Sequence, residues 1–281
     1  MQLVHTAAQL DAALAPARAA AKTIGLVPTM GALHQGHLSL VDLAQESSDV
    51  VVVSIFVNPK QFGEGEDFDK YPRTLDADVV LLEGKADIVF APSALDVYPQ
   101  NVEVPTKHAG PVGSLFEGAS RPGHFDGMLT VVARLFDLVG PDIAVFGQKD
   151  AQQLALVTSM AAADFPQIEV IAAETVREPS GLAMSSRNRF LNSEQFEIAE
   201  ILAISLLAVC ELIESGMDAS AALEIGREMI SGEPETKLDY LALVDPSTFV
   251  PLNDGYTGPA LLIVAAQVGE VRLIDNLPFQ I

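Results

Sequence analysis

The feature that most restricts the fold of this chain is one run of eight residues, Val50-Val51-Val52-Val53-Ser54-Ile55-Phe56-Val57. Most of these side chains are branched at Cβ, which favours an extended backbone over a helix. Successive side chains of a strand point to opposite faces of its sheet. Because apolar residues occupy both alternating sets of positions, both faces of this strand must be covered, as in a parallel sheet with helices on each side.

Shorter apolar runs alternate with helical patterns along the first part of the chain. We predict strands at residues 24–27, 49–57, 87–90, 143–146 and 168–172, and a further short strand at 102–108. The segment Thr6-Ala7-Ala8-Gln9 fits a capping box and predicts a helix that runs to about Lys22. Other helices are predicted at 38–44, 72–85, 125–139 and 150–164. This alternation indicates an α/β fold with a Rossmann-like, doubly wound parallel sheet.

The pattern changes after about residue 175. Two helices are predicted at 193–215 and 219–230, and three strands follow at 238–244, 260–266 and 271–276. Helices followed by strands are typical of an α+β domain. We therefore expect a first domain over residues 1–175 and a second, smaller α+β domain over residues 176–281.

The net charge of −22 restricts the partners of this chain. Nucleic acids and anionic membranes would be repelled over most of the surface. No apolar run approaches the roughly 18 residues of a membrane helix, and the first residues lack the pattern of a signal peptide. The only cysteine, Cys210, cannot form an internal disulfide and is predicted to be buried. We expect a cytoplasmic protein that binds neither nucleic acid nor membrane.

Histidine and glycine residues follow the strand predicted at 24–27. The sequence there is Pro28-Thr29-Met30-Gly31-Ala32-Leu33-His34-Gln35-Gly36-His37, and a helix comes next. The first N–H groups of a helix lack intrahelical partners and the helix dipole is positive there, so such a junction binds phosphate. Gly31 and Gly36 allow the backbone to approach a ligand closely. His34 and His37 add donors for phosphate oxygens, although a turn cap or half of a metal site would also use two histidines.

Two further polar clusters follow predicted strands, Asn58-Pro59-Lys60-Gln61-Phe62 and Gly147-Gln148-Lys149-Asp150. In a parallel sheet the carboxyl ends of the strands share one edge, where ligands bind. Lys149 is suited to phosphate oxygens as a point charge. Gln61 and Gln153 could orient a hydroxylated substrate, since an amide both donates and accepts. Each of these residues taken alone fits an ordinary surface position better than a binding site.

Two arginine-containing segments complete the set of polar clusters. Arg121 lies in Arg121-Pro122-Gly123-His124-Phe125, which suits an anion or an ion pair. The segment Met184-Ser185-Ser186-Arg187-Asn188-Arg189 offers hydroxyl and guanidinium donors, which suit phosphate. A solvated loop would have a similar composition, but a loop that closes over a nucleotide would exclude water.

Seven segments together resemble the pantoate–β-alanine ligase family. His34-Gln35-Gly36-His37 is similar to the HxGH signature of a nucleotidyltransferase superfamily that includes class I aminoacyl-tRNA synthetases, and Met184 to Arg187 resemble its second phosphate loop. The narrower resemblance covers about residues 23–192, and Lys60 departs from it, since an apolar residue is expected there. It rests on Pro28 to His34, Phe56 to Pro59, Gln61-Phe62, Tyr71-Pro72-Arg73-Thr74, Arg121 to Phe125, Gly147 to Asp150, and Met184 to Arg189.

The resemblance implies ATP-dependent ligation of pantoate and β-alanine through a pantoyl adenylate, with release of AMP and pyrophosphate. The product, pantothenate, is a precursor of coenzyme A. The catalytic residues would be His34, His37, Lys149, Ser185, Ser186 and Arg187, acting on the triphosphate together with Mg²⁺. The ATP-binding residues would be Met30, Gly31, Ala32, Leu33, His34, Gln35, Gly36, His37, Gly147, Gln148, Lys149, Asp150, Val176, Met184, Ser185, Ser186 and Arg187.

The resemblance also implies a pantoate site and an assembly. Gln61 and Gln153 would bind pantoate, with Arg121 and Tyr71 near the same pocket and Gln61 also near β-alanine. No side chain is implied as a resident metal ligand, and the family is typically a homodimer. Two other hypotheses remain open at this stage: a different HxGH enzyme that adenylylates another substrate, and a nucleotide-binding regulator without catalytic activity.

Overall fold

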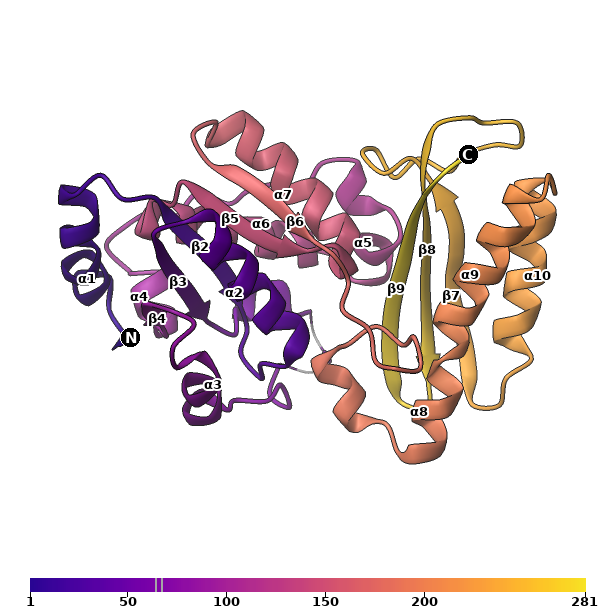
Figure 1. Ribbon diagram of the computed structural model, residues 1–281, viewed down its shortest axis with the longest axis horizontal. Helices are drawn as coiled ribbons and strands as arrows, with labels where there is room; N and C mark the ends of the chain where they lie inside the picture. The colour runs from indigo at the N-terminus through magenta and orange to yellow at the C-terminus, as the bar shows by residue number, and fades with distance from the viewer. Residues whose placement is uncertain (64, 67) are drawn as a thin grey trace. The chain divides into compact units, whose positions relative to one another are not determined.

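A computed structural model describes residues 1–63, 65, 66 and 68–281 of the chain. The chain forms two compact units (Figure 1). The first unit comprises Met1–Gln148 and Gln152–Ala173, and the second comprises Lys149–Ala151 and Glu174–Ile281. Each unit has its own hydrophobic core.

The first unit is built on a parallel six-stranded sheet with the order β1-β4-β3-β2-β5-β6. The first six residues of the apolar run 50–57 form β3, which pairs with β2 from Ile24↔Val50 to Thr29↔Ile55. The described strands are β1 Gln2–Val4, β2 Ile24–Thr29, β3 Val50–Ile55, β4 Ile88–Phe90, β5 Ile143–Gly147 and β6 Glu169–Ala173.

Helices cover both faces of this sheet, as its two-sided apolar strands predicted. On one face, Leu26 and Val52 pack with apolar residues of α1, α6 and α7. On the other face, Val27 and Val53 pack with residues of α2 and α3. The helices of this part are α1 Ala7–Ala19, α2 Gln35–Ser47, α3 Leu75–Leu82, α4 Ala94–Val97, α5 Glu117–Ser120, α6 His124–Val139 and α7 Ala151–Asp164. The short 3₁₀ helices are η1 Pro59–Gln61, η2 Val112–Ser114 and η3 Gln148–Asp150.

The strand order reverses between the central strands β2 and β5. Successive strands β3 and β4 add on one side of β2, whereas β5 and β6 add on the other side. In an open α/β sheet such a switch point leaves a crevice beyond the carboxyl ends of the two strands. Here those ends lead into residues 30–37 and into Gln148, so the topology places two of the predicted polar clusters at the switch point.

The second unit contains the antiparallel sheet β7-β8-β9 and the helices that pack on it (Figure 1). Its core combines apolar residues of α9 and α10 with inward-facing residues of β8, such as Leu262 and Val264. Its elements are η4 Ser186–Phe190, α8 Ser193–Ala199, α9 Ile201–Glu214, α10 Ala219–Ser231, β7 Thr236–Val244, β8 Pro259–Val268 and β9 Val271–Gln280. The predicted α+β character is confirmed.

Three expectations about elements were wrong. Residues 102–108 form no strand: Pro105 lacks an N–H, and the Lys107 N–H donates to Thr130 Oγ1 at 2.9 Å instead of to a strand. The helix predicted at 193–215 is two helices separated at Glu200. The helix predicted to start at Pro72 starts at Leu75, and the edge strand β1 was not predicted.

Two local predictions are confirmed. Thr6 caps α1 in a capping box with Gln9. Cys210 is buried in α9, and burial raises the pKa of its thiol to about 11. Among the described residues, no helix has both the length and the apolar character needed to cross a membrane.

Candidate functional site

The loop between β2 and α2 is held by a buried carboxylate. Gly31 and Ala32 both have positive φ, +81° and +53°, so the backbone turns sharply there. Asp78 of α3 accepts hydrogen bonds from the N–H groups of Ala32 and Leu33, at 3.0 and 2.8 Å. Thr74 Oγ1 donates to the same carboxylate at 3.2 Å, and Asp78 is 1% exposed. Asp78 was not identified from the sequence. A carboxylate among the apolar residues of α3 would have indicated a buried, hydrogen-bonded group.

The two histidines of the loop make consecutive caps at the start of α2. The Gly36 N–H donates to Nδ1 of His34 at 3.2 Å, and the His34 N–H donates to Nδ1 of His37 at 3.3 Å. The ring centroids lie 4.1 Å apart. A nitrogen that accepts a hydrogen bond carries no proton, so each neutral ring has its proton on Nε2. Both imidazoles are therefore set to donate from Nε2 at the positive end of α2.

Gln61 lies against the same loop. Its Nε2 contacts Sδ of Met30 at 3.2 Å, and its Oε1 accepts from Asn58 Nδ2 at 3.2 Å. Asn58 is fully buried, and its Oδ1 accepts from Tyr98 at 2.9 Å. Burial raises the pKa of Tyr98, so this phenol remains a donor. Asn58 thus fixes which end of the Gln61 amide faces Met30.

Arg121 forms an ion pair, one of the two roles that its segment suggested. Its Nε and Nη2 donate to the two carboxylate oxygens of Glu66, at 3.1 and 2.6 Å. Burial acts to raise the pKa of Glu66, but the hydrogen bond and charge of Arg121 outweigh it, and the pKa is lowered. The positive charge of Arg121 is therefore already balanced within the first unit.

His124 connects Arg121 to Gln61. Its Nδ1 lies 2.8 Å from the Gln61 carbonyl oxygen, so Nδ1 carries a proton. Its Nε2 lies 3.1 Å from Nη1 of Arg121 and must accept from that guanidinium. Burial and the charge of Arg121 lower the pKa of His124, which favours the neutral ring that this arrangement requires. Sequence reasoning quoted His124 within a motif but gave it no role.

The other predicted pantoate residues of the first unit have different surroundings. Gln153 is half-buried and its side chain bonds to no other described residue. The neighbouring Gln152 is buried and structural, since its Nε2 donates to the carbonyl oxygens of Val112 and Leu115. Tyr71 is buried, with its ring centroid 6.0 Å from that of Phe62.

In the second unit, residues 176–184 form a tight hairpin that leads into the serine–arginine segment. The Met184 N–H donates to the Val176 carbonyl at 2.9 Å, so these two predicted nucleotide residues are neighbours. Ser185 then caps η4, and its Oγ accepts from the Arg187 N–H at 3.2 Å. Asn188, which is buried, donates from Nδ2 to the Ala183 carbonyl. Ser185 and Arg187 are thereby held at the start of a defined helical turn.

The predicted residues are divided between the two units. Lys149 belongs to the second unit, where its carbonyl accepts from Asn276 Nδ2 at 2.8 Å. The first unit holds Met30 to His37, Gln61, Tyr71, Arg121, Gly147, Gln148 and Gln153. The second unit holds Lys149, Asp150, Val176, Met184, Ser185, Ser186 and Arg187.

The donor set of these residues suits a polyphosphate. It combines imidazole N–H groups, an ammonium, a guanidinium and hydroxyls, all of which donate to anionic oxygens. Among the described residues, no group of three or more histidine, cysteine, aspartate or glutamate side chains gathers as a metal site. Donors of these types can bind and neutralise a phosphate chain without a covalent nucleophile.

Sequence comparison finds one family over nearly the whole chain. The profile of the family described as Pantoate-beta-alanine ligase matches residues 2–278. The chain is 52% identical over 275 residues to a pantothenate synthetase of Leifsonia xyli, covering 98% of this chain and 95% of that protein. It is 48% identical over 279 residues to a pantothenate synthetase of Thermus thermophilus, covering 99% of both.

Solved structures give the same result. The crystal structure of pantothenate synthetase from Thermus thermophilus matches with a TM-score of 0.92 and 47% identity, covering 99% of both chains. A pantoate-beta-alanine ligase from Francisella tularensis, solved with beta-gamma ATP and beta-alanine, matches with a TM-score of 0.76 and 34% identity. That match covers 99% of this chain and 97% of the Francisella chain.

Proposed function

The chain belongs to the pantoate-beta-alanine ligase family, and from this premise we propose that it activates pantoate as an acyl adenylate. It is an ATP-dependent ligase that forms pantothenate from pantoate and β-alanine. A carboxylate is a poor electrophile and does not condense with an amine near neutral pH. Adenylation converts it into a mixed anhydride with a good leaving group, which explains why ATP is consumed.

In the first step, a carboxylate oxygen of pantoate attacks the α-phosphorus of ATP, and the bond to pyrophosphate breaks. Catalysis of this step depends on positioning and on charge stabilisation. We assign the Nε2–H groups of His34 and His37 to the triphosphate, with His37 as the main donor to the developing charge. The observation that carries this assignment is the pair of Nδ1 caps, which places the proton of each neutral ring on Nε2.

In this proposal, the catalytic residues that lie in the second unit neutralise the leaving pyrophosphate. Lys149 and Arg187 supply positive charge to the β- and γ-phosphate oxygens, and Ser185 and Ser186 supply hydroxyl donors. The remaining proposed nucleotide contacts are Met30, Gly31, Ala32, Leu33, Gln35, Gly36, Gly147, Gln148, Asp150, Val176 and Met184. In this proposal, residues 1–175 bind nucleotide and pantoate, and residues 176–281 carry the phosphate loop.

In the second step, the amine of β-alanine attacks the acyl carbon, and AMP leaves with the electrons of the broken anhydride bond. We assign Gln61 and Gln153 to pantoate, and Gln61 also to β-alanine. Tyr71 and Arg121 are assigned to the edge of the same pocket. The charge of Arg121 is already balanced by Glu66. Arg121 therefore contributes to the pantoate pocket through its contact with His124, which bonds to the Gln61 backbone, as much as through its charge.

Mg²⁺ fits this site as a companion of ATP. The buried carboxylate that holds the β2–α2 loop, Asp78 of α3, already accepts from three donors, so it is not available as a metal ligand. Mg²⁺ is commonly held by substrate phosphates and water with few protein ligands. When bound, it would neutralise phosphate charge, and Lys149 and Arg187 would complement it.

The same proposal extends to assembly and location. We propose a homodimer, which the family resemblance supports, and analytical ultracentrifugation at micromolar concentration would measure it. We also propose a cytoplasmic protein, which the single cysteine supports because reducing compartments lack structural disulfides.

The decisive experiment measures pyrophosphate release from ATP and Mg²⁺, with and without (R)-pantoate and β-alanine. We expect release that requires pantoate, with AMP and pantothenate formed only when β-alanine is also present. Pyrophosphate release without pantoate would instead indicate a different HxGH substrate. Absence of release with every combination, in folded protein, would indicate a nucleotide-binding regulator.

A further inference from the structure

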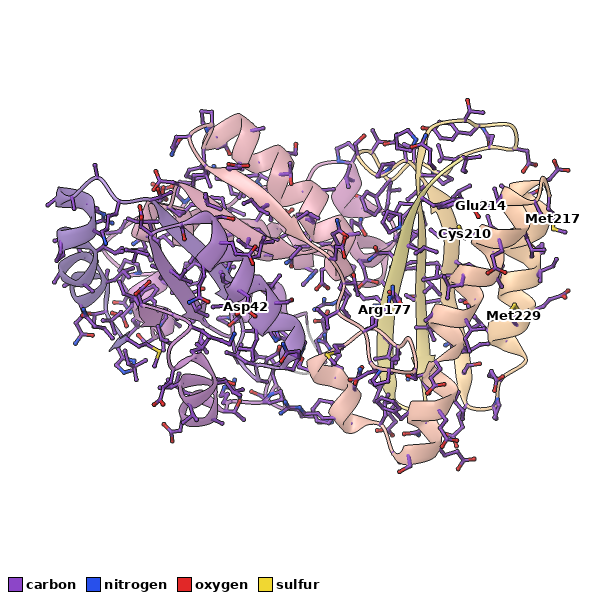
Figure 2. The ribbon with its side chains drawn as sticks, in the orientation of Figure 1. Asp42, Arg177, Cys210, Glu214, Met217 and Met229 are labelled. Carbon is purple, nitrogen blue, oxygen red and sulfur yellow. The ribbon has the colours of Figure 1, made fainter. Side chains whose placement is uncertain are left out.

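One strand of the second unit contacts two of the segments that the proposed function assigns to the nucleotide, Lys149 and the hairpin of residues 176–184. Strand β9 carries Asp275 and Asn276 next to each other, and both are buried. Figure 2 labels Arg177 beside this strand. Arg177 lies in the hairpin of residues 176–184, whose ends are Val176 and Met184.

Asp275 anchors the hairpin through Arg177. Nη1 and Nη2 of Arg177 donate to the two carboxylate oxygens of Asp275, at 2.6 and 3.0 Å. The same guanidinium donates to the Gly181 carbonyl at 2.9 Å and to the Asn276 carbonyl at 3.2 Å. One side chain thus ties the turn of the hairpin to the side chain of Asp275 and to the backbone of β9.

Asn276 anchors Lys149. Its Nδ2 donates to the Lys149 carbonyl at 2.8 Å, across 127 positions of sequence. Its own N–H donates to Asp275 Oδ1 at 2.7 Å, which links the two anchors. Residues 149–151 belong to the second unit, although residues 152–173 on their C-terminal side belong to the first.

The charge arrangement also suits a neighbouring anion site. The Asp275 side chain is 1% exposed, and a buried carboxylate in a chain of net charge −22 would repel phosphate if it were uncompensated. The bidentate pair with Arg177 removes that penalty and fixes the geometry at the same time.

We propose that Arg177, Asp275 and Asn276 are positioning residues that fix Lys149 and the 176–184 hairpin to one strand. They set the spacing between the Lys149 ammonium and the serine–arginine segment, and this spacing determines how tightly Lys149 and that segment together bind a triphosphate. This inference rests on the proposed assignment of Lys149, Val176 and Met184 to the nucleotide. None of the three positioning residues is proposed to touch the reacting atoms.

The test compares nucleotide affinity in four full-length proteins: the parent, Asn276→Ala, Lys149→Ala, and the double variant. Titration calorimetry with a non-hydrolysable ATP analogue and Mg²⁺ gives the dissociation constants without turnover. We expect Asn276→Ala to weaken binding about tenfold, the effect of one lost hydrogen bond. In the Lys149→Ala background the same change should weaken binding by less than about twofold, because Asn276 affects binding only by positioning the Lys149 side chain.

Two further variants separate positioning from general stability. Asp275→Asn removes the buried partner of Arg177, whereas Asp239→Asn removes an exposed partner of Arg272 on the same sheet. We expect the first to raise KM for ATP more than KM for β-alanine, and the second to change neither by more than about twofold. Arg177→Lys, which keeps the charge, should lie between the parent and Asp275→Asn in its KM for ATP.

Each outcome decides a different point. Unchanged affinity in Lys149→Ala would refute the nucleotide assignment and the inference together. Weakened binding in Lys149→Ala with unchanged binding in folded Asn276→Ala would refute the inference alone. An equal loss from Asn276→Ala in both backgrounds, or equal rises in the KM for ATP and the KM for β-alanine of Asp275→Asn, would show a purely structural role.

Discussion

At the scale of single residues, the geometry of the HxGH segment depends on which ring nitrogen carries the proton. Both Nδ1 atoms are used as acceptors by backbone N–H groups at the start of α2. The caps therefore do two things: they satisfy N–H groups of the first helical turn, and they orient the Nε2–H groups. The buried carboxylate of Asp78 holds the preceding backbone in its left-handed turn.

We predict that His37→Ala or Lys149→Ala lowers kcat by at least about 100-fold, the range for loss of one charge-stabilising donor. Both variants should remain folded, because neither side chain belongs to a hydrophobic core, and the cap that His37→Ala removes should cost only about 1 kcal/mol. Steady-state pyrophosphate release measures the effect, and Lys22→Ala, at an exposed position, is the matched control. Near-parental turnover in either folded variant would remove that residue from the mechanism.

The stability of the first unit should depend on the protonation of His124. Its pKa is lowered in the folded protein by burial and by Arg121, whereas the unfolded chain retains a value near 6.5. The folded state thus binds fewer protons, and the full stability is present above about pH 6.5. Stability is lost as the pH falls from there through the lowered pKa, with a slope below about 1.4 kcal/mol per pH unit, the value for one proton.

Urea unfolding between pH 7.5 and 5 measures this dependence. His124→Gln cannot titrate, so its stability should fall less steeply than that of the parent over this window. An identical slope in the parent and His124→Gln would contradict the assignment.

At the scale of elements, the site depends on the close approach of α6 to η1. A Cβ at Gly127 would lie 2.0 Å from the Lys60 carbonyl oxygen and 2.8 Å from the Gln61 nitrogen. Asn58 Nδ2 donates to the Gly127 carbonyl at 3.0 Å, so the two elements are also hydrogen-bonded. The absence of a side chain at Gly127 therefore decides where the Gln61 amide lies.

Gly127→Ala should destabilise the protein, although alanine favours helix over glycine by about 1 kcal/mol. The clash is with backbone atoms, which cannot rotate away, so we expect a loss of about 1–3 kcal/mol in the free energy of unfolding. The KM for pantoate should rise because Gln61 is displaced. Gly63→Ala is the control, since its Cβ would meet Glu66 at an ordinary 3.5 Å. A Gly127→Ala protein more stable than the parent would show that the helices can separate at no cost.

At the scale of the whole molecule, the net charge of −22 sets a background against which each cation acts. Self-repulsion of a strongly charged chain destabilises its compact state, and salt screens it over about 10 Å at 0.1 M. The acidic surface also repels ATP and pantoate at long range. The proposed site must therefore concentrate scarce positive groups, of which the chain has 16 lysines and arginines.

We predict that the melting temperature rises on the order of 2–4 °C between 0.02 and 0.3 M NaCl, equivalent to about 1 kcal/mol. Scanning calorimetry at pH 7.5 measures it. Four substitutions of exposed acids by lysine, at Asp137, Glu197, Glu228 and Glu270, change the net charge from −22 to −14. The salt effect should be smaller in that variant, and an equal effect in both proteins would rule out self-repulsion as its cause.

The sequence by itself determined the types of the main elements and the position of the strand-to-helix junction that carries His34 and His37. Two-sided apolar runs such as residues 50–55 record burial on both faces, and burial on both faces requires a sheet covered by helices. The capping of α1 by Thr6 and of α2 by His34 was likewise local, because each cap involves residues within one turn. These features depend only on neighbours in the chain.

The tertiary structure alone decided which distant groups meet. Asp78 reaches Ala32 across 46 positions and Asn276 reaches Lys149 across 127, and no local pattern contains either pairing. Residues 102–108 were predicted as a short strand, but Thr130 of α6 accepts the Lys107 N–H and no strand forms. The physical reason is that hydrophobic periodicity shows which side chains are buried. Which distant residues cover them depends on how whole helices and strands pack together.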